Sequence, residues 1–299
     1  MTRTDLRKAI HNGTFLLDGA MGTQLFARGV SPGVCNDAIN IESPDIVADI
    51  HRAYLQAGSD AIITNTFGAN RHALARHGHA EKAYTISRAG AELARQVTGE
   101  GRHVLGDIGP TGDFLEPLGQ LKACDVRVAF AEQARGLLDG GVDGFIIETM
   151  TALDELEVAI KAVESLESGL PVFASMAFDK AGSDYRTMMG VDVSTAVTKM
   201  IALGVDAVGF NCGTATLDEY VTLAHKYVSA ACSTGIGVAV FAEPNAGKPE
   251  LVDGEAVYRV TPEEFAAAAK RIQEAGVHVL GGCCGTTPAF IAALAAALK

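Results

Sequence analysis

Eight short runs of apolar and β-branched residues, each followed by a longer segment with helical spacing, constrain the fold of this 299-residue chain most strongly. Continuously apolar strands that alternate with helices are typical of a parallel sheet covered by helices. The predicted strands lie at 15–18, 61–66, 103–108, 144–148, 171–178, 207–212, 237–243 and 277–283. The predicted helices lie at 44–57, 82–97, 126–138, 153–165, 193–203, 217–229, 262–275 and 288–298.

A short repeated motif precedes four of these strands, and in each copy a glycine that can end a helix comes just before the apolar run. The copies are AGSDA (57–61), GGVDG (140–144), LGVDA (203–207) and AGVHV (275–279). Eight βα units in a chain of this length predict a (β/α)8 TIM barrel, although a doubly wound open sheet has the same alternation. We favour the barrel, as a single domain over 1–299, because polar residues end nearly every predicted strand.

Composition narrows the class of partner. The chain carries 36 acidic and 24 basic residues, a formal charge of −12, which disfavours binding to nucleic-acid phosphates or anionic lipid. No apolar run approaches the roughly 20 residues of a membrane span, and the charged N-terminus is not followed by a long apolar stretch. We therefore expect a cytoplasmic protein with a small-molecule substrate and with no nucleic-acid or membrane partner.

Three cysteines end two of the predicted strands: Cys212 in GFNCG (209–213), and Cys283 and Cys284 in GGCCGTT (281–287). In a barrel the carboxyl ends of the strands meet at one mouth, where active sites of this fold are built. A catalytic Zn²⁺ typically has three protein ligands and one exchangeable position. Zn²⁺ with three thiolates would bind a further thiolate and keep it deprotonated. The site therefore suits alkyl transfer to a substrate thiol.

The alternative is that Cys212 is a buried small hydrophobe and the adjacent pair a structural or redox element. Two groups at matching strand ends favour the metal, because the neighbouring glycines permit the turn that two consecutive cysteines need to face one ion. A structural zinc would need a fourth protein ligand, and the nearest candidate, His278, lies too far back on its strand. The remaining cysteines, Cys35, Cys124 and Cys232, are most simply incidental.

Acidic residues at other strand ends indicate an amino-acid substrate. Asp18 and Glu148 could hold an ammonium group by charge-assisted hydrogen bonds. The backbone amides of the turn GAMGT (19–23) could bind a carboxylate. The alternative is that such acids cap the following helices, and Asp107 carries the same ambiguity.

On these motifs the chain resembles the homocysteine S-methyltransferase family, from LDGAMGT (17–23) to GGCCGTTP (281–288). The resemblance implies a barrel in which the three cysteines bind Zn²⁺ and homocysteine thiolate is the fourth ligand. That thiolate would attack a methyl group to form methionine. The motifs NTFGA (65–69), GDIGPTG (106–112) and EPNAGKP (243–249) resemble the homocysteine module of cobalamin-dependent methionine synthase in particular.

This second likeness extends the expected site. It implies substrate contacts from residues in these motifs and an asparagine near the fourth zinc position, for which an Asx-turn is the alternative. The expected substrate residues are Asp18, Gly19, Thr66, Asp107, Glu148 and Asn245.

The likeness also implies methylcobalamin as the methyl donor. Because no segment is left to bind a corrinoid, we expect the donor on a separate corrinoid protein or module. The alternatives are a homocysteine methyltransferase that uses S-methylmethionine or betaine, a corrinoid-linked methyltransferase with another substrate, and a non-catalytic zinc docking subunit.

Overall fold

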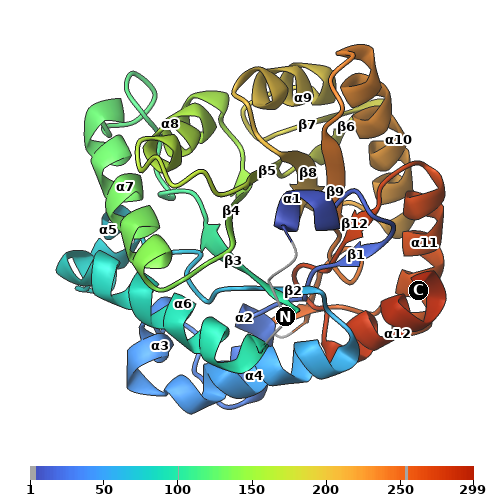
Figure 1. The fold of residues 1–299 in the computed structure, drawn as a ribbon. Helices are drawn as coiled ribbons and strands as arrows, with labels where there is room; N and C mark the ends of the chain where they lie inside the picture. The colour runs from blue at the N-terminus through green and yellow to red at the C-terminus, as the bar shows by residue number, and fades with distance from the viewer. Residues whose placement is uncertain (1–4, 100, 253–254) are drawn as a thin grey trace.

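A computed structural model describes residues 5–99, 101–252 and 255–299. Within these ranges eight parallel strands form one sheet, in the order β1-β12-β9-β8-β5-β4-β3-β2, which curves into a nearly closed barrel ringed by helices (Figure 1). This confirms the predicted (β/α)8 fold. The strands are β1 Phe15–Leu16, β2 Ala61–Ile63, β3 His103–Ile108, β4 Gly144–Met150, β5 Val172–Met176, β8 Ala207–Asn211, β9 Ala239–Glu243 and β12 Val279–Leu280.

Each predicted helix is present in the outer ring. The long helices are α4 Pro44–Ala57, α6 Ala83–Thr98, α7 Ala123–Asp139, α8 Leu153–Glu164, α9 Val193–Ala202, α10 Leu217–Ser233, α11 Pro262–Glu274 and α12 Pro288–Leu298. Local sequence sets their ends: Thr216 and Thr261 form capping boxes at the starts of α10 and α11, and Gly58 ends α4 with a φ of 113°. Over the described ranges, no helix combines the length and apolar character that crossing a membrane requires.

Several short elements were not predicted. The helices are α1 Leu6–Ala9, α2 Gly22–Ala27, α3 Ile39–Glu42, α5 Arg71–Ala75, η1 Asn36–Ala38 and η2 Ala80–Lys82. The hairpin strands are β6 Asp179–Ala181, β7 Asp184–Arg186, β10 Glu250–Val252 and β11 Glu255–Val257. Apart from α1, they lie in connections that follow barrel strands. Segments of three to six residues are too short to show a hydrophobic period.

The core has two layers. Residues that point into the barrel, among them Leu105, Phe173 and Phe241, form an inner cluster, and the ring centroids of the two phenylalanines are 5.6 Å apart. Leu6 and Ile10, in and just after α1, belong to the same cluster. A second and larger cluster fills the space between the strands and the helices. The barrel interior is therefore packed solid at the end where its strands begin.

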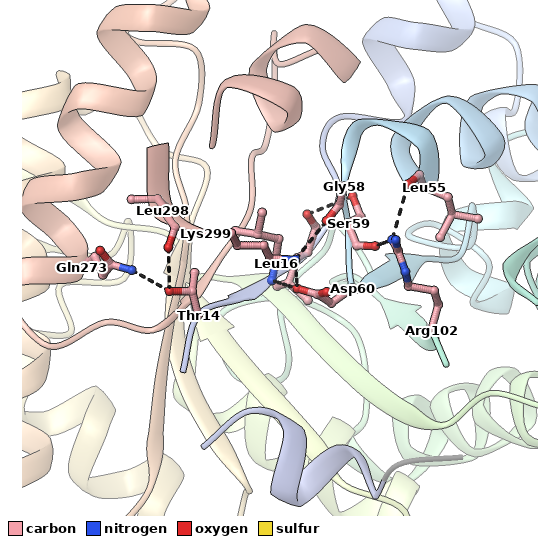
Figure 2. Close-up of polar contacts among 11 residues, drawn as sticks. Thr14, Leu16, Leu55, Gly58, Ser59, Asp60, Arg102, Gln273, Leu298 and Lys299 are labelled. Carbon is pink, nitrogen blue, oxygen red and sulfur yellow. Dashed lines mark hydrogen bonds and ion pairs between the residues drawn. The ribbon is translucent and has the colours of Figure 1, made fainter. Parts of the chain in front are cut away.

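At that end a side chain closes the seam between the first and last strands of the sheet. The backbone N–H of Asp60 donates to the Leu16 carbonyl at 2.6 Å, and the Asp60 carboxylate accepts the Leu16 N–H at 2.8 Å. Lys299 donates to the same carboxylate at 2.6 Å (Figure 2). Nearby, Thr14 joins Gln273 to the Leu298 carbonyl. We call the reciprocal pair of bonds between the aspartate and the facing strand an aspartate clasp.

Two further clasps occur in two other copies of the repeated motif, where it reads GVD (141–143 and 204–206). Asp143 exchanges the same two bonds with Val104, at 2.8 and 2.9 Å, and Asp206 does so with Val172, also at 2.8 and 2.9 Å. Each clasp aspartate also pairs with a basic side chain, Arg95 for Asp143 and Arg7 for Asp206. The fourth motif has histidine, His278, in the aspartate position. The repeated motif therefore fastens three strand pairs, β1–β2, β3–β4 and β5–β8.

Candidate metal and substrate site

Three thiols meet at the mouth of the barrel. Cys212 follows β8, and Cys283 and Cys284 follow β12. Their sulfur atoms all lie within 4.8 Å of one another, with 4.0 Å from Cys212 to Cys284 and 3.9 Å from Cys283 to Cys284. In the described ranges they form the one His, Cys, Asp or Glu group close enough to hold a metal. Three soft thiol donors fit Zn²⁺ and leave a position for one more ligand.

Backbone geometry rather than a regular strand brings the thiols together. Cys212 has a φ of 55°, which non-glycine residues rarely adopt, and its carbonyl accepts the Tyr220 hydroxyl at 2.6 Å. A Cβ at Gly282 would lie 2.6 Å from Thr286 Oγ1, and one at Gly285 would lie 2.2 Å from the Tyr258 ring. The glycines around the cysteine pair are therefore required by close contacts.

Hydrogen bonds among the three thiols shift their pKa values in different directions. Hydrogen bonds from Cys212 and Cys283 lower the pKa of Cys284 to about 3, and the pKa of Cys283 is raised by its bonds to both neighbours and by burial. The Tyr258 hydroxyl also lowers the pKa of Cys284. A cation at this point would favour all three thiolates, because a coordinated thiol is deprotonated.

Four carboxylates surround the same mouth, at the ends of β1, β3, β4 and β9; we call them the acid ring. They are Asp18, Asp107, Glu148 and Glu243. Burial raises the pKa of all four, and repulsion from other members of the ring adds to this effect for Asp18, Asp107 and Glu243. Burial, with repulsion from Cys212, raises the pKa of Glu148 to about 7. The ring and the cysteines line one cavity of about 530 Å³. Since carboxylates this close cannot all ionise, a cationic group entering the cavity would be favoured.

Comparison with known proteins identifies the barrel. The family model described as homocysteine S-methyltransferase matches residues 15–298. The chain belongs to the homocysteine S-methyltransferase family.

Two relatives show how much of a larger protein this barrel matches. It is 37% identical over 314 aligned residues to a methionine synthase of Mycobacterium tuberculosis, covering 99% of this chain and 25% of the relative. It is 36% identical to a methionine synthase of Mycobacterium leprae, with the same coverage. The chain thus spans about a quarter of the length of these relatives.

A solved structure shows the same fold. The metallated form of the homocysteine methyltransferase MmuM from Escherichia coli has a TM-score of 0.79 at 24% identity, covering 98% of this chain and 99% of that one. The apo form of the same protein gives a TM-score of 0.74 at 22% identity. The homocysteine S-methyltransferase barrel is therefore matched along almost its whole length.

Most of the predicted substrate residues line the cavity of this family barrel. Asp18 accepts the Ile63 N–H at 3.1 Å, so one of its oxygens also joins β1 to β2 at the mouth. Gly19 is tightly packed, because a Cβ there would lie 2.7 Å from Thr286 Oγ1. The remaining predicted lining residues are Thr66, Asp107 and Glu148.

Thr66 and Asp107 are held together. The Thr66 hydroxyl donates to the Asp107 carbonyl at 2.8 Å. Burial, with repulsion from Glu148, raises the pKa of Asp107, whose Oδ1 is buried with no hydrogen-bond partner among the described residues. The helix-capping alternative is wrong for these acids, because the N-cap residues of α2, α7 and α8 are Met21, Lys122 and Ala152.

Asn245 lies next to the cysteine segment and is not among the residues that line the cavity. Its Nδ2 donates to the Gly213 carbonyl at 2.7 Å, and its N–H donates to the Tyr220 hydroxyl at 3.4 Å. Its Oδ1 is buried and has no partner within the described ranges. Asn245 thus fixes the turn after Cys212, and its Oδ1 is left without a hydrogen-bond partner among the described residues.

Sequence reasoning missed three residues of this site. No role is predicted from the sequence for Asn211 in GFNCG (209–213) or for Glu243 in EPNAGKP (243–249), and the sequence gives no signal for Tyr258, which lies in a loop. The position of Asn211, directly before a metal-ligand candidate at a strand end, is the signal that could have found it.

Proposed function

We propose that this chain is a zinc-dependent homocysteine S-methyltransferase that forms methionine. The observation that carries the proposal is the three-thiol cluster sharing one cavity with the acid ring. Cys212, Cys283 and Cys284 would hold Zn²⁺, and the bound ion would keep the sulfur of the substrate as a thiolate at neutral pH. The family, and relatives named methionine synthase, support the same reaction.

The chain's own residues would bind the amino-acid end of homocysteine. Asp18 and Glu148 supply carboxylates for the ammonium group, and that positive charge would relieve the repulsion within the acid ring. The backbone after Gly19 would bind the carboxylate of the substrate. Thr66 and Asp107 form the facing wall. Holding both ends of homocysteine presents its sulfur toward the open mouth in one orientation.

We further propose that the methyl group comes from methylcobalamin on a separate corrinoid protein or module. Three apolar residues at the rim of the cavity support a large donor: Phe26, Val34 and Phe67 are 43%, 41% and 41% exposed. The cavity of about 530 Å³ also exceeds the volume of one amino acid. We place the enzyme in the cytoplasm, because three clustered thiols require a reducing compartment.

The test is stoichiometric methyl transfer from free methylcobalamin to L-homocysteine, followed by visible absorbance on zinc-loaded protein. We expect transfer by the wild type and by Cys232→Ala, whose cysteine is exposed and remote from the mouth, and none by Cys283→Ala. Transfer that survives in Cys283→Ala contradicts the zinc-thiol proposal. Transfer only from S-methylmethionine or betaine would show that methylcobalamin is not the methyl donor. No transfer from any donor would favour a non-catalytic zinc docking subunit.

A further inference from the structure

One buried amide, the side chain of Asn211, connects the acid ring to the cysteines. Asn211 ends β8, is 1% exposed and directly precedes Cys212. Its Oδ1 accepts the Thr149 N–H at 2.9 Å and the Ser175 hydroxyl at 2.8 Å. Its Nδ2 donates to the Glu148 carboxylate and, at 2.7 Å, to Thr149 Oγ1.

The partners of this amide fix its orientation. A backbone N–H can only donate, so the amide atom that faces the Thr149 nitrogen must be the oxygen. The amide nitrogen then has to face Glu148, whose carboxylate needs a donor. Thr149 has a φ of 60°, a conformation that non-glycine residues rarely adopt, and its bond to Asn211 helps to hold it there. A flipped amide would lose bonds on both sides.

The same nitrogen lies 3.9 Å from the Cys283 sulfur. Asn211 is also joined through the backbone to Cys212. One side chain is therefore bonded to the carboxylate of Glu148 while it contacts or adjoins two of the three thiols. Each of these links is a direct contact between residues of the barrel strands and their ends.

We propose that Asn211 is a positioning residue that sets the distance between the carboxylate for the substrate ammonium and the thiols that would hold the metal. The inference rests on the proposed function and specifies how the site selects its substrate. The amine and the sulfur of homocysteine are a fixed number of bonds apart, so both ends bind at once only if Glu148 and the cysteines keep the matching separation. A thiol without the amino group needs only the metal end.

The test compares L-homocysteine with 4-mercaptobutyrate, which has the same carbon chain and carboxylate and no amino group. In Asn211→Ala we expect the KM for L-homocysteine to rise about tenfold, the effect of losing a hydrogen bond to a charged group. The KM for 4-mercaptobutyrate, kcat and the zinc content should each change by less than about twofold, because the metal end is intact. Calorimetric titration of the zinc-loaded protein with each thiol, without a donor, should show the same difference in affinity.

A double variant and a control variant distinguish a positioning role of Asn211 from a general effect on the structure. In Glu148→Gln, the further change Asn211→Ala should add nothing to the loss for L-homocysteine, since Asn211 acts through Glu148. Asn70→Ala removes another fully buried asparagine, which caps α5 and does not line the cavity, and should alter neither thiol. Should Asn211→Ala not fold, Asn211→Asp keeps the acceptor oxygen, removes the donor, and should show the same preference.

Equal losses for the two thiols, or loss of zinc from the variant, would overturn the inference. Failure of the proposed function looks different, because the wild type itself would then not methylate L-homocysteine. The calorimetric comparison reports on Asn211 in either case.

Discussion

Carboxylates at the two ends of the barrel differ in their hydrogen-bond and charge partners. At the base, each clasp aspartate accepts a backbone N–H from the facing strand and pairs with a lysine or arginine. At the mouth, Asp107 Oδ1 and Glu243 Oε2 are buried with no partner among the described residues, and burial raises the pKa of both groups. The charges at the base therefore stabilise the fold, whereas an ionised Asp107 or Glu243 at the mouth costs stability until a ligand arrives.

The largest effect should come from breaking the clasp that closes the seam. Asp60→Ala leaves the Leu16 N–H without its acceptor and Lys299 without its ion pair, so we expect the free energy of unfolding to fall by about 3 kcal/mol. Urea denaturation of the metal-free protein measures it. The control Asp49→Ala removes an exposed pair with Arg52 and should cost about 0.5 kcal/mol or less. Equal costs for the two variants would mean that the clasp does not hold the seam.

A buried acid at the mouth should make stability depend on pH. Burial raises the pKa of Asp37, which lines the cavity, from 3.8 to about 6. Since the folded protein then holds this proton more tightly than the unfolded chain, the contribution is complete below about pH 4 and is lost as the pH rises to about 6. We expect Asp37 to contribute about 2 kcal/mol to the loss across that window, so the loss should be smaller by that amount in Asp37→Asn, where the acid ring still contributes its own share.

Urea denaturation at several pH values, compared with Asp45→Asn on the exposed first turn of α4, tests this prediction. A pH-dependent loss as large in Asp37→Asn as in the wild type would contradict the prediction for Asp37.

Removing a charge from the acid ring should stabilise the metal-free protein. Glu243→Gln replaces a buried carboxyl whose pKa is raised by burial with a neutral group, so we expect a gain of about 1 kcal/mol at pH 8. The same change should weaken the binding of L-homocysteine, because the ring then repels less without ligand and attracts the ammonium less. Thermal unfolding and titration calorimetry measure the two effects, with the exposed Glu263→Gln as control. A destabilised Glu243→Gln protein would place this acid with those at the base.

The smallest effect should come from the last residue. Lys299 pairs with Asp60 at a partly exposed position, so Lys299→Met should cost about 0.5 kcal/mol, and 1 M salt should reduce the difference from wild type. Urea denaturation at two salt concentrations measures it. A cost as large as that of Asp60→Ala would show that the ion pair, rather than the backbone bonds, closes the seam.

The sequence predicted the barrel because its strands are apolar runs and its helices are amphipathic and capped, and both signals are local. The strand at 61–66 shows where such signals end. β2 stops at Ile63, because Thr64 and Thr66 turn their hydroxyl groups toward each other and toward the Asp107 backbone. The hairpins β6–β7 and β10–β11 depend on pairing between strands of three residues each, which are too short to show a hydrophobic period.

For the site, strand ends were enough to bring Cys212 and the cysteine pair to one place, since parallel strands of a barrel share a mouth. The link made by Asn211 could not be predicted in the same way. It depends on the left-handed backbone of Thr149 and on which way one amide faces, and both follow from tertiary contacts. The repeat itself could likewise be recognised in the sequence, but the hydrogen bonds of its aspartate to a neighbouring strand could not be predicted.

The aspartate clasps also divide part of the barrel into units of two strands. Each fastens a strand to the one before it in the barrel, in β1–β2, β3–β4 and β5–β8, so a unit of two strands carries its own fastening. Chimaeras joined between β2 and β3, or between β4 and β5, would inherit every clasp intact. Crossovers inside a pair would separate an aspartate from its acceptor strand. Recombination among related barrels should therefore succeed most often at quarter-barrel boundaries.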